Sequence, residues 1–413
     1  MPLKPTPEST DAAEVLGPMS AWRFVVSFGV VSMLADFVYE GARSVTSPLL
    51  VSLGASAFVV AVVTGAGEAA ALVLRLVSGP LADRTRRFWT LAISGYTLTV
   101  ITVPLLGLTS VLWVACTLVI LERVGKAVRS PSKDTLLSHA ASGIGRGRGF
   151  AVHEAMDQFG ALIGPLLVAL ILALTHNDYA PALGVLAIPG IGVLVVLAWL
   201  AKRVPDPSAF ELDGTAPKSV SRPRIGRADL SREYWEYCGF TALTVGATAT
   251  FGVLGFHIAH RGLSSAATIP VIYACAMGAA ALAALAAGWL FDKVGAKTIA
   301  VLPLVSSFVP LLAFTNTLTW SVVAAIVWGA ATGVQESTMR ATVAELVPSD
   351  RRATAYGIYA AVIGGATIIG SAVIGLLYSV SIPALIIVMI AAQGASLVVF
   401  GVVLRSRSRR ALG

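Results

Sequence analysis

Charged residues are scarce in this sequence. Of its 413 residues only 13% are charged, whereas 56% are hydrophobic. An ordinary soluble protein carries about 25% charged residues and does not expose large apolar patches to water. The composition therefore argues against a water-soluble protein and indicates a chain whose natural solvent is the lipid bilayer.

Cysteine is also rare, and Cys116, Cys238 and Cys275 stand singly in apolar runs. No CxxC pair is present, so the sequence suggests neither a metal-binding cage nor a disulfide framework. The string "HEAMD" at 153–157 lacks the second His of the metalloprotease motif HExxH, and "GIGRGRG" at 143–149 lacks the Lys-Ser/Thr ending of a P-loop. We expect no metal, no cofactor and no direct use of ATP.

Long apolar runs fill most of the chain. A membrane-spanning helix needs about 20 mostly apolar residues, and windows of that kind recur between breaks at Gly, Pro or charge. They predict twelve spans, near 22–47, 57–81, 89–107, 110–130, 149–174, 181–201, 234–259, 267–290, 298–316, 319–341, 354–378 and 382–404.

The distribution of Lys and Arg predicts the orientation, because cytoplasmic loops carry an excess of these residues. With the N-terminus inside, the outer loops hold Arg261 and little else. We therefore expect an integral protein of the plasma membrane (the bacterial inner membrane) with both termini cytoplasmic. Membrane orientation also explains the net charge of +8, so no nucleic-acid partner is needed.

The chain divides into two similar halves. Gly79 and Asp83 recur 209 residues later as Gly288 and Asp292. The expected divisions are a disordered N-terminal lead over 1–20, a six-helix bundle over 21–203, a cytoplasmic linker over 204–232, a second six-helix bundle over 233–404 and a basic cytoplasmic tail over 405–413. The lead lacks the short apolar core of a cleaved signal peptide.

The charged turn between spans two and three carries a family resemblance. "GPLADRTRR" resembles the loop signature of the major facilitator superfamily, although Arg86 replaces the usual Gly. The resemblance implies an all-α membrane protein of twelve transmembrane helices in two pseudo-symmetric six-helix bundles, working by alternating access. The matching residues are Gly79, Leu81, Ala82, Asp83, Arg84 and Arg87 in the first copy, and Gly288, Leu290, Asp292, Lys293 and Gly295 in the second.

This motif has two interpretations. Gly79 would permit close helix packing, and Asp83 could accept hydrogen bonds at a neighbouring helix N-terminus, so that the charges close the cytoplasmic face in one conformation. Alternatively, Arg84 and Arg87 only enforce the orientation.

Two weaker resemblances lie in spans four and five. "LVILERVGKAVR" is similar to the family's second signature through Arg123 and Gly125, with compressed spacing. "FGALIGPLL" resembles a degraded antiporter signature through Gly160, Gly164 and Pro165. Helix packing alone would also account for such spacing of small residues.

Ionisable side chains inside the predicted spans are candidates for function, because each costs about 2.5–3.5 kcal/mol near the bilayer centre. They concentrate in the first half, and the corresponding positions of the second half are mostly apolar or small. We therefore expect the first half to carry the proton chemistry and the second half to supply a more apolar wall. The candidate proton and substrate residues are Asp36, Glu40, Arg43, Glu68, Glu122, Arg123, Asp157, Glu336 and Arg340.

Spacing suggests how some of these charges pair. Asp36, Glu40 and Arg43 share one helix face. Glu40 with Arg43, and Glu122 with Arg123, are expected pairs that a proton would break, whereas Asp36, Glu68 and Asp157 are expected to be unpaired titrating carboxylates. Alternatively, each is part of a structural salt bridge. His153 and Glu154 are the weakest candidates because they lie near the inner end of span five.

The acidic first half and the span-five string favour proton-coupled efflux of a small organic compound, as in the twelve-span drug antiporters that the sequence resembles. We expect a monomer whose partners are its small-molecule substrate, protons and membrane lipids. The alternative is proton-coupled uptake of a metabolite or organic anion bound by Arg43, Arg75, Arg123 or Arg340. A transporter-like sensor is more remote, because the linker and tail are too short for a signalling domain. An enzyme is not expected, because no nucleophile–base or metal constellation stands out.

Overall fold

The computed structural model describes residues 19–142, 146–206, 210, 230–347 and 352–410, and within these every regular element is a helix. The helices are α1 (Ala21–Ser52), α2 (Ala57–Val73), α3 (Arg75–Thr85), α4 (Phe88–Leu108), α5 (Leu112–Ser142), α6 (Arg146–Leu174), α7 (Tyr179–Gly184), α8 (Ala187–Arg203), α9 (Arg232–Gly246), α10 (Phe251–His260), α11 (Thr268–Val294), η2 (Gly295–Ala300), α12 (Val301–Ala313), α13 (Leu318–Leu346), α14 (Arg352–Val380) and α15 (Ile382–Arg410).

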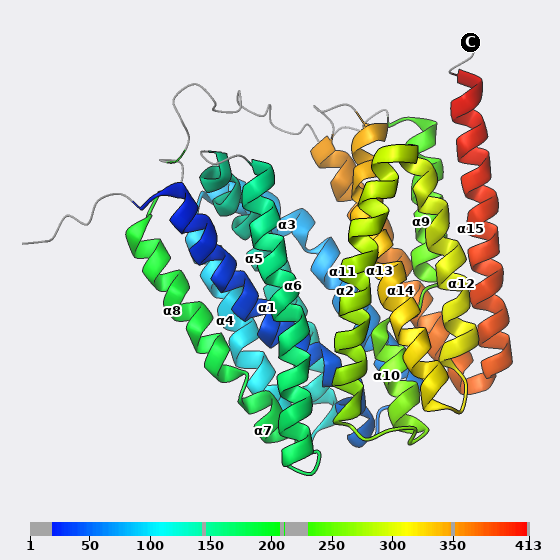
Figure 1. The fold of residues 1–413 in the computed structure, drawn as a ribbon, viewed down its shortest axis with the longest axis horizontal. Coiled ribbons are helices and arrows are strands. Elements are labelled where there is room, and N and C mark those ends of the chain that lie inside the picture. The colour runs from blue at the N-terminus through cyan, green and yellow to red at the C-terminus, as the bar shows by residue number, and fades with distance from the viewer. Residues whose placement is uncertain (1–18, 143–145, 207–209, 211–229, 348–351, 411–413) are drawn as a thin grey trace, which may run out of the picture.

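These helices make twelve crossings, as the hydrophobic windows predicted. Ten stretches of the described residues are long and apolar enough to span a bilayer. One of them, Thr268–Ala313, contains two crossings, because α11 runs to one edge of the bundle and α12 returns from it (Figure 1). The twelfth crossing is α5, which carries more charged residues than these ten stretches and was predicted from the apolar window near 110–130.

Several crossings are broken helices. The seventh crossing is interrupted between α9 and α10 at Ala247–Thr250. A backbone carbonyl freed by such a break must find a partner, because lipid offers none. The indole of Trp328 donates a hydrogen bond to the carbonyl of Ala249 (2.9 Å), and the amide of Gln393 donates one to the carbonyl of Thr244 (3.0 Å).

The helices form two groups, α1–α8 and α9–α15, which meet at one side of the molecule (Figure 1). The start of α1, the end of α8, the start of α9 and the end of α15 all lie at one edge, which we call the terminal side (Figure 1). Across the interface, α2 packs on α14, α6 on α11 and α1 on α10.

The apolar core follows the same division. One cluster contains buried residues of both groups, among them Val45, Leu49, Phe251 and Phe256. Two other clusters, around Phe24 in the first group and around Tyr237 in the second, each belong mainly to one group and lie nearer the terminal side. The shared core therefore joins the halves on the side opposite the termini, and we call that side the closed side.

Candidate functional site

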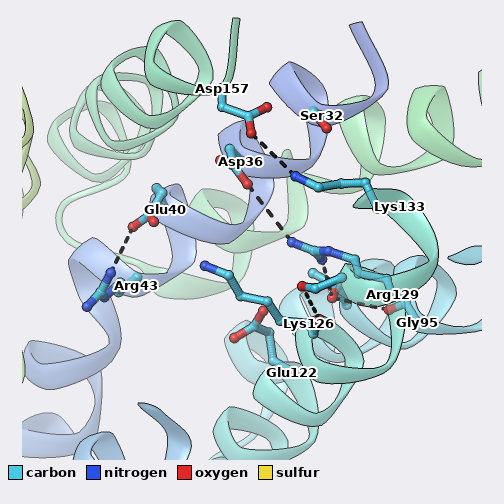
Figure 2. A network of polar contacts seen from close by, with 12 residues as sticks. Ser32, Asp36, Glu40, Arg43, Gly95, Glu122, Lys126, Arg129, Lys133 and Asp157 are labelled. Carbon is cyan, nitrogen blue, oxygen red and sulfur yellow. Dashed lines mark hydrogen bonds and ion pairs between the residues drawn. The ribbon is translucent and has the colours of Figure 1, made fainter. Parts of the chain in front are cut away.

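The charged residues of the first half come together between α1, α2, α5 and α6 (Figure 2). They form two clusters. We call the first the Arg43 cluster, made of Glu40, Arg43, Glu68, Glu122 and Arg123. We call the second the Lys133 cluster, made of Asp36, Arg129, Lys133, His153 and Asp157.

The Arg43 cluster is a chain of ion pairs across three helices. The Arg43 guanidinium lies 3.5 Å from the Glu40 carboxylate on the same helix and 2.7 Å from the Glu68 carboxylate of α2. Arg123 of α5 lies 3.4 Å from Glu68 and 3.4 Å from Glu122. Two arginines thus hold three carboxylates, so this cluster carries an excess negative charge when all three are ionised.

One residue of the second half joins this cluster. The hydroxyl of Tyr273, on α11, donates a hydrogen bond to the Glu40 carboxylate. The Tyr273 ring is buried against Phe251 (4.6 Å between ring centres) and near Trp328 (6.4 Å). The wall that the second half presents to Glu40 is therefore aromatic, with a polar tip.

The Lys133 cluster lies nearer the terminal side. Arg129 lies 3.9 Å from Asp36, and Lys133 lies 3.5 Å from Asp157. His153 stands between α6 and α1, because one ring nitrogen is 2.6 Å from the Ser32 hydroxyl and the other is 3.4 Å from Asp157.

The α4 helix completes this cluster. The Arg129 guanidinium donates a hydrogen bond to the Thr99 hydroxyl (3.0 Å) and lies 4.6 Å from the centre of the Tyr96 ring. Both partners are buried. They fix Arg129 in the interior, where it faces Asp36 across the bundle.

Three sequence expectations about the carboxylates are wrong. Asp36, Glu68 and Asp157 are not unpaired, because each has a cation within 4 Å, contributed by another helix. His153 is not a marginal residue at the helix end, because it is 4% exposed and joins α1 to α6. Sequence reasoning also missed Lys133 and Tyr273, since neither shares a helix with its partner.

A small cavity borders the Arg43 cluster on the closed side. Its volume of ≈ 10 Å³ is enough for about one water molecule. One oxygen of the buried Glu122 carboxylate makes no hydrogen bond within the described residues, and a water here could satisfy it. The cavity is lined by Ala42, Arg43, Thr46, Thr102, Val103, Leu106, Leu118, Val119, Glu122 and Arg123.

The two candidates in the second half, Glu336 and Arg340, both lie on α13. Glu336 has an exposed side chain. Arg340 is in the same helix, but its side chain lies outside the part of the structure that is described.

The span-five motif packs α6 on α1. A Cβ atom at Gly160 would overlap the backbone of Met33, and one at Gly164 would overlap the backbone of Phe37. Pro165 follows within α6. The spacing of small residues thus lets two backbones touch at the level where α1 carries Asp36 and Glu40.

The loop motifs are not engaged in this conformation. Asp83, Arg84 and Arg87 are exposed, and no ion pair joins them to another described residue. A Cβ atom at Gly79 or Gly288 would meet nothing within 4 Å, so the expected close helix packing at these glycines is absent from the described structure. In the second copy, Asp292 is exposed and the Lys293 ammonium lies 3.5 Å over the Trp289 ring.

The twelve crossings in two groups, with a charged interior, define a polytopic membrane transporter. The family model described as Major Facilitator Superfamily matches residues 28–302 and 237–412. The chain belongs to this superfamily, and it is an integral membrane protein, a secondary transporter and not an enzyme.

Relatives and solved structures agree with this assignment. The chain is 61% identical over 381 residues to the uncharacterized protein Rv2265 of Mycobacterium tuberculosis, covering 92% of each chain. It is 23% identical to the uncharacterized MFS-type transporter MJ1317 of Methanocaldococcus jannaschii, covering 86% of this chain and 89% of the relative.

Among solved structures, a point mutant of the nucleoside transporter NupG has a TM-score of 0.73 at 14% identity, covering 92% of this chain and 99% of NupG. A point mutant of the peptide transporter POT in complex with sulfate has a TM-score of 0.71 at 14% identity, covering 93% of this chain and 94% of the transporter. At this identity the likeness concerns the fold alone.

Proposed function

We propose that this protein couples the movement of a small organic solute to protons by alternating access, with the carboxylates of the first half as the proton sites. The observation that carries the proposal is the position of Glu40. Its carboxylate pairs with Arg43 in its own half and accepts the Tyr273 hydroxyl from the other half. A proton on Glu40 would weaken both contacts. The protonation of Glu40 and the contact between the two halves on the closed side would therefore depend on each other.

The two possible directions of transport rest on different features. Efflux in exchange for protons rests on the span-five resemblance, whose glycines Gly160 and Gly164 already have a packing role. Co-transport with protons rests on the cations of the interior, which suit an anionic solute. The location that we propose is a bacterial plasma membrane with cytoplasmic termini, supported by the loop charges and by the mycobacterial relatives.

The coupling of Glu40 to the closed side can be tested without a substrate. Trp113 at the start of α5 and Val380 at the end of α14 are exposed and lie on the closed side, one in each half. The substitutions Trp113→Cys and Val380→Cys, in a chain whose native cysteines are replaced by alanine, supply two sites for spin labels. Pulsed EPR then reports the separation of the halves.

We expect the distance between the labels to lengthen as the pH falls, because protonated Glu40 no longer holds Arg43 and Tyr273 together. Glu40→Gln should show the longer distance at every pH. Glu154→Gln is the matched control, since Glu154 is exposed and bonded only to Gln158 (3.0 Å) among the contacts of the described residues. A pH response that persists in Glu40→Gln would refute the role of Glu40.

The direction can be read in liposomes that contain a pH-sensitive dye. Exchange predicts that ethidium added outside makes the interior more alkaline, whereas co-transport predicts that benzenesulfonate added outside makes it more acidic. Benzenesulfonate is chosen because it carries no proton through lipid by itself. Protein-free liposomes provide the baseline.

A further inference from the structure

Most cations of the described interior of the first half have a carboxylate within 4 Å. In the described part of the first half, Arg43, Arg123, Arg129 and Lys133 each have such a partner. Lys126 of α5 has none among the described residues, although it lies between the two clusters. Its ammonium instead lies over the face of Tyr39, 3.8 Å from the ring centre.

Two of the acids near Lys126, Asp36 and Glu40, already have other partners. In Figure 2 the Lys126 side chain extends into the space beside Asp36 and Glu40. Asp36 faces Arg129, and Glu40 binds both Arg43 and the Tyr273 hydroxyl. In this conformation both carboxylates are directed to those partners, and no carboxylate of the described residues lies within 4 Å of the Lys126 ammonium.

Tyr39 holds this ammonium in place. Its ring is buried and is contacted by Arg123 as well, at 4.4 Å from the ring centre. Its hydroxyl is buried and makes no hydrogen bond within the described residues. A cation on an aromatic face keeps its full charge and its N–H donors, because the ring accepts no proton and forms no ion pair. The Lys126 ammonium can therefore receive an anion.

We propose that Lys126 binds the negatively charged group of the transported solute, which is a small organic molecule carrying a carboxylate or a group of similar charge. This inference rests on the proposed transport function and names the solute class. The Lys126 ammonium donates hydrogen bonds to the anion, as an ordinary charge-assisted contact. Sulfate and phosphate share the charge, and the experiment separates them from organic anions.

The charge balance links this anion to protons. The two clusters and Lys126 contain five carboxylates (Asp36, Glu40, Glu68, Glu122 and Asp157) and five Lys or Arg side chains (Arg43, Arg123, Lys126, Arg129 and Lys133), with His153 counted as neutral. An anion bound at Lys126 leaves one uncompensated negative charge in the interior. That charge favours protonation of a nearby carboxylate, so the anion and a proton bind together. Cooperative binding of this kind favours co-transport over exchange.

Matched pairs of probes test the inference on the purified full chain in detergent. Benzoate is compared with benzamide, and hexanoate with hexanamide, because each pair differs in charge and little in shape. Sodium sulfate is the arm for inorganic anions. The readout is the shift in melting temperature, followed for any stabilising probe by the proton uptake in weakly buffered solution.

We expect at least one carboxylate to stabilise the wild type while its amide does not, with uptake of up to one proton per anion. Lys126→Gln should weaken the carboxylate response at least tenfold in affinity, and Lys126→Arg should retain part of it. Lys202→Gln is the control, because Lys202 is exposed at the end of α8. A second neutral variant, Lys126→Met, guards against a folding defect of the first.

Three outcomes would overturn the inference. They are equal stabilisation by acids and amides, no carboxylate response in the wild type, and an undiminished response in Lys126→Gln. Stabilisation by sulfate alone would show an inorganic anion site and would also overturn the claim about the solute. The test does not involve the pH-dependent separation of the halves, so its failure is distinguishable from failure of the proposed proton coupling.

Discussion

The hydroxyl of Tyr273 provides the most direct way to shift the conformational equilibrium. Tyr273→Phe removes the hydrogen bond to Glu40 and keeps the ring that packs on Phe251 and Trp328. A hydrogen bond to a charged group contributes about 1.5–3 kcal/mol. This bond joins the two halves. In the other conformation the halves are separated on the side opposite the termini, so the bond is absent there unless Tyr273 moves with α1.

The size of the population change follows from the loss of this hydrogen bond in one conformation and not in the other. If the whole contribution is lost from one conformation only, the population ratio changes by about 10- to 150-fold toward separation. Glu40 and Arg43 lie on one helix, three residues apart, so we take their pair to be the same in both conformations and to cancel. The pulsed EPR distance between labels at positions 113 and 380 measures this ratio. We expect the longer distance to become the main population in Tyr273→Phe at neutral pH.

Two controls sharpen the experiment. Tyr237→Phe removes an equally buried hydroxyl, which donates to the Met339 carbonyl (3.0 Å) within the second half, and it should not change the distance. The double variant Tyr273→Phe with Glu40→Gln should behave like either single variant, because both changes remove the same contact. Additive effects, or an unchanged distance in Tyr273→Phe, would refute the argument.

Three further predictions concern packing, ion pairing and the loop motif. Gly164→Ala should lower the free energy of unfolding by about 1–3 kcal/mol because its Cβ would overlap the Phe37 backbone, whereas Gly184→Ala, with open space around it, should leave the melting temperature unchanged. Arg129→Gln should lower the free energy of unfolding by about 1–3 kcal/mol, because it removes the buried hydrogen bond to Thr99 and the cation that faces Asp36; a thermal melt checks this, and partial recovery by the added change Asp36→Asn would confirm the pairing. Asp83→Asn should leave the melting temperature unchanged, since Asp83 is exposed here, but it should shift the EPR distance between positions 113 and 380 toward the shorter value if the loop closes the terminal side in the other conformation.

The membrane setting and the crossings follow from the sequence alone. Runs of about 20 apolar residues have few alternatives to a helix in lipid, because every backbone group must bond within its own segment. Even the charged α5 was predicted, because its apolar residues form a window near 110–130. The repeated motif at Gly79 and Gly288 indicated two equivalent halves, and the family match agrees with that pattern.

Local spacing also predicted some contacts of the site. The pairing of Glu40 with Arg43 follows from their separation of three residues on one helix, and such pairs depend only on helix geometry. The proximity of Glu122 and Arg123 is equally local.

The remaining partners of the site are fixed by packing between helices. Whether Asp36 faces Arg129, and whether Asp157 faces Lys133, depends on how α1, α5 and α6 are rotated about their axes. That rotation is set by close packing at positions such as Gly160 and Gly164, not by the spacing of charges along any one helix. The same rotation places Lys126 on the Tyr39 ring, between the two clusters, because contacts between helices are determined by packing across the whole bundle.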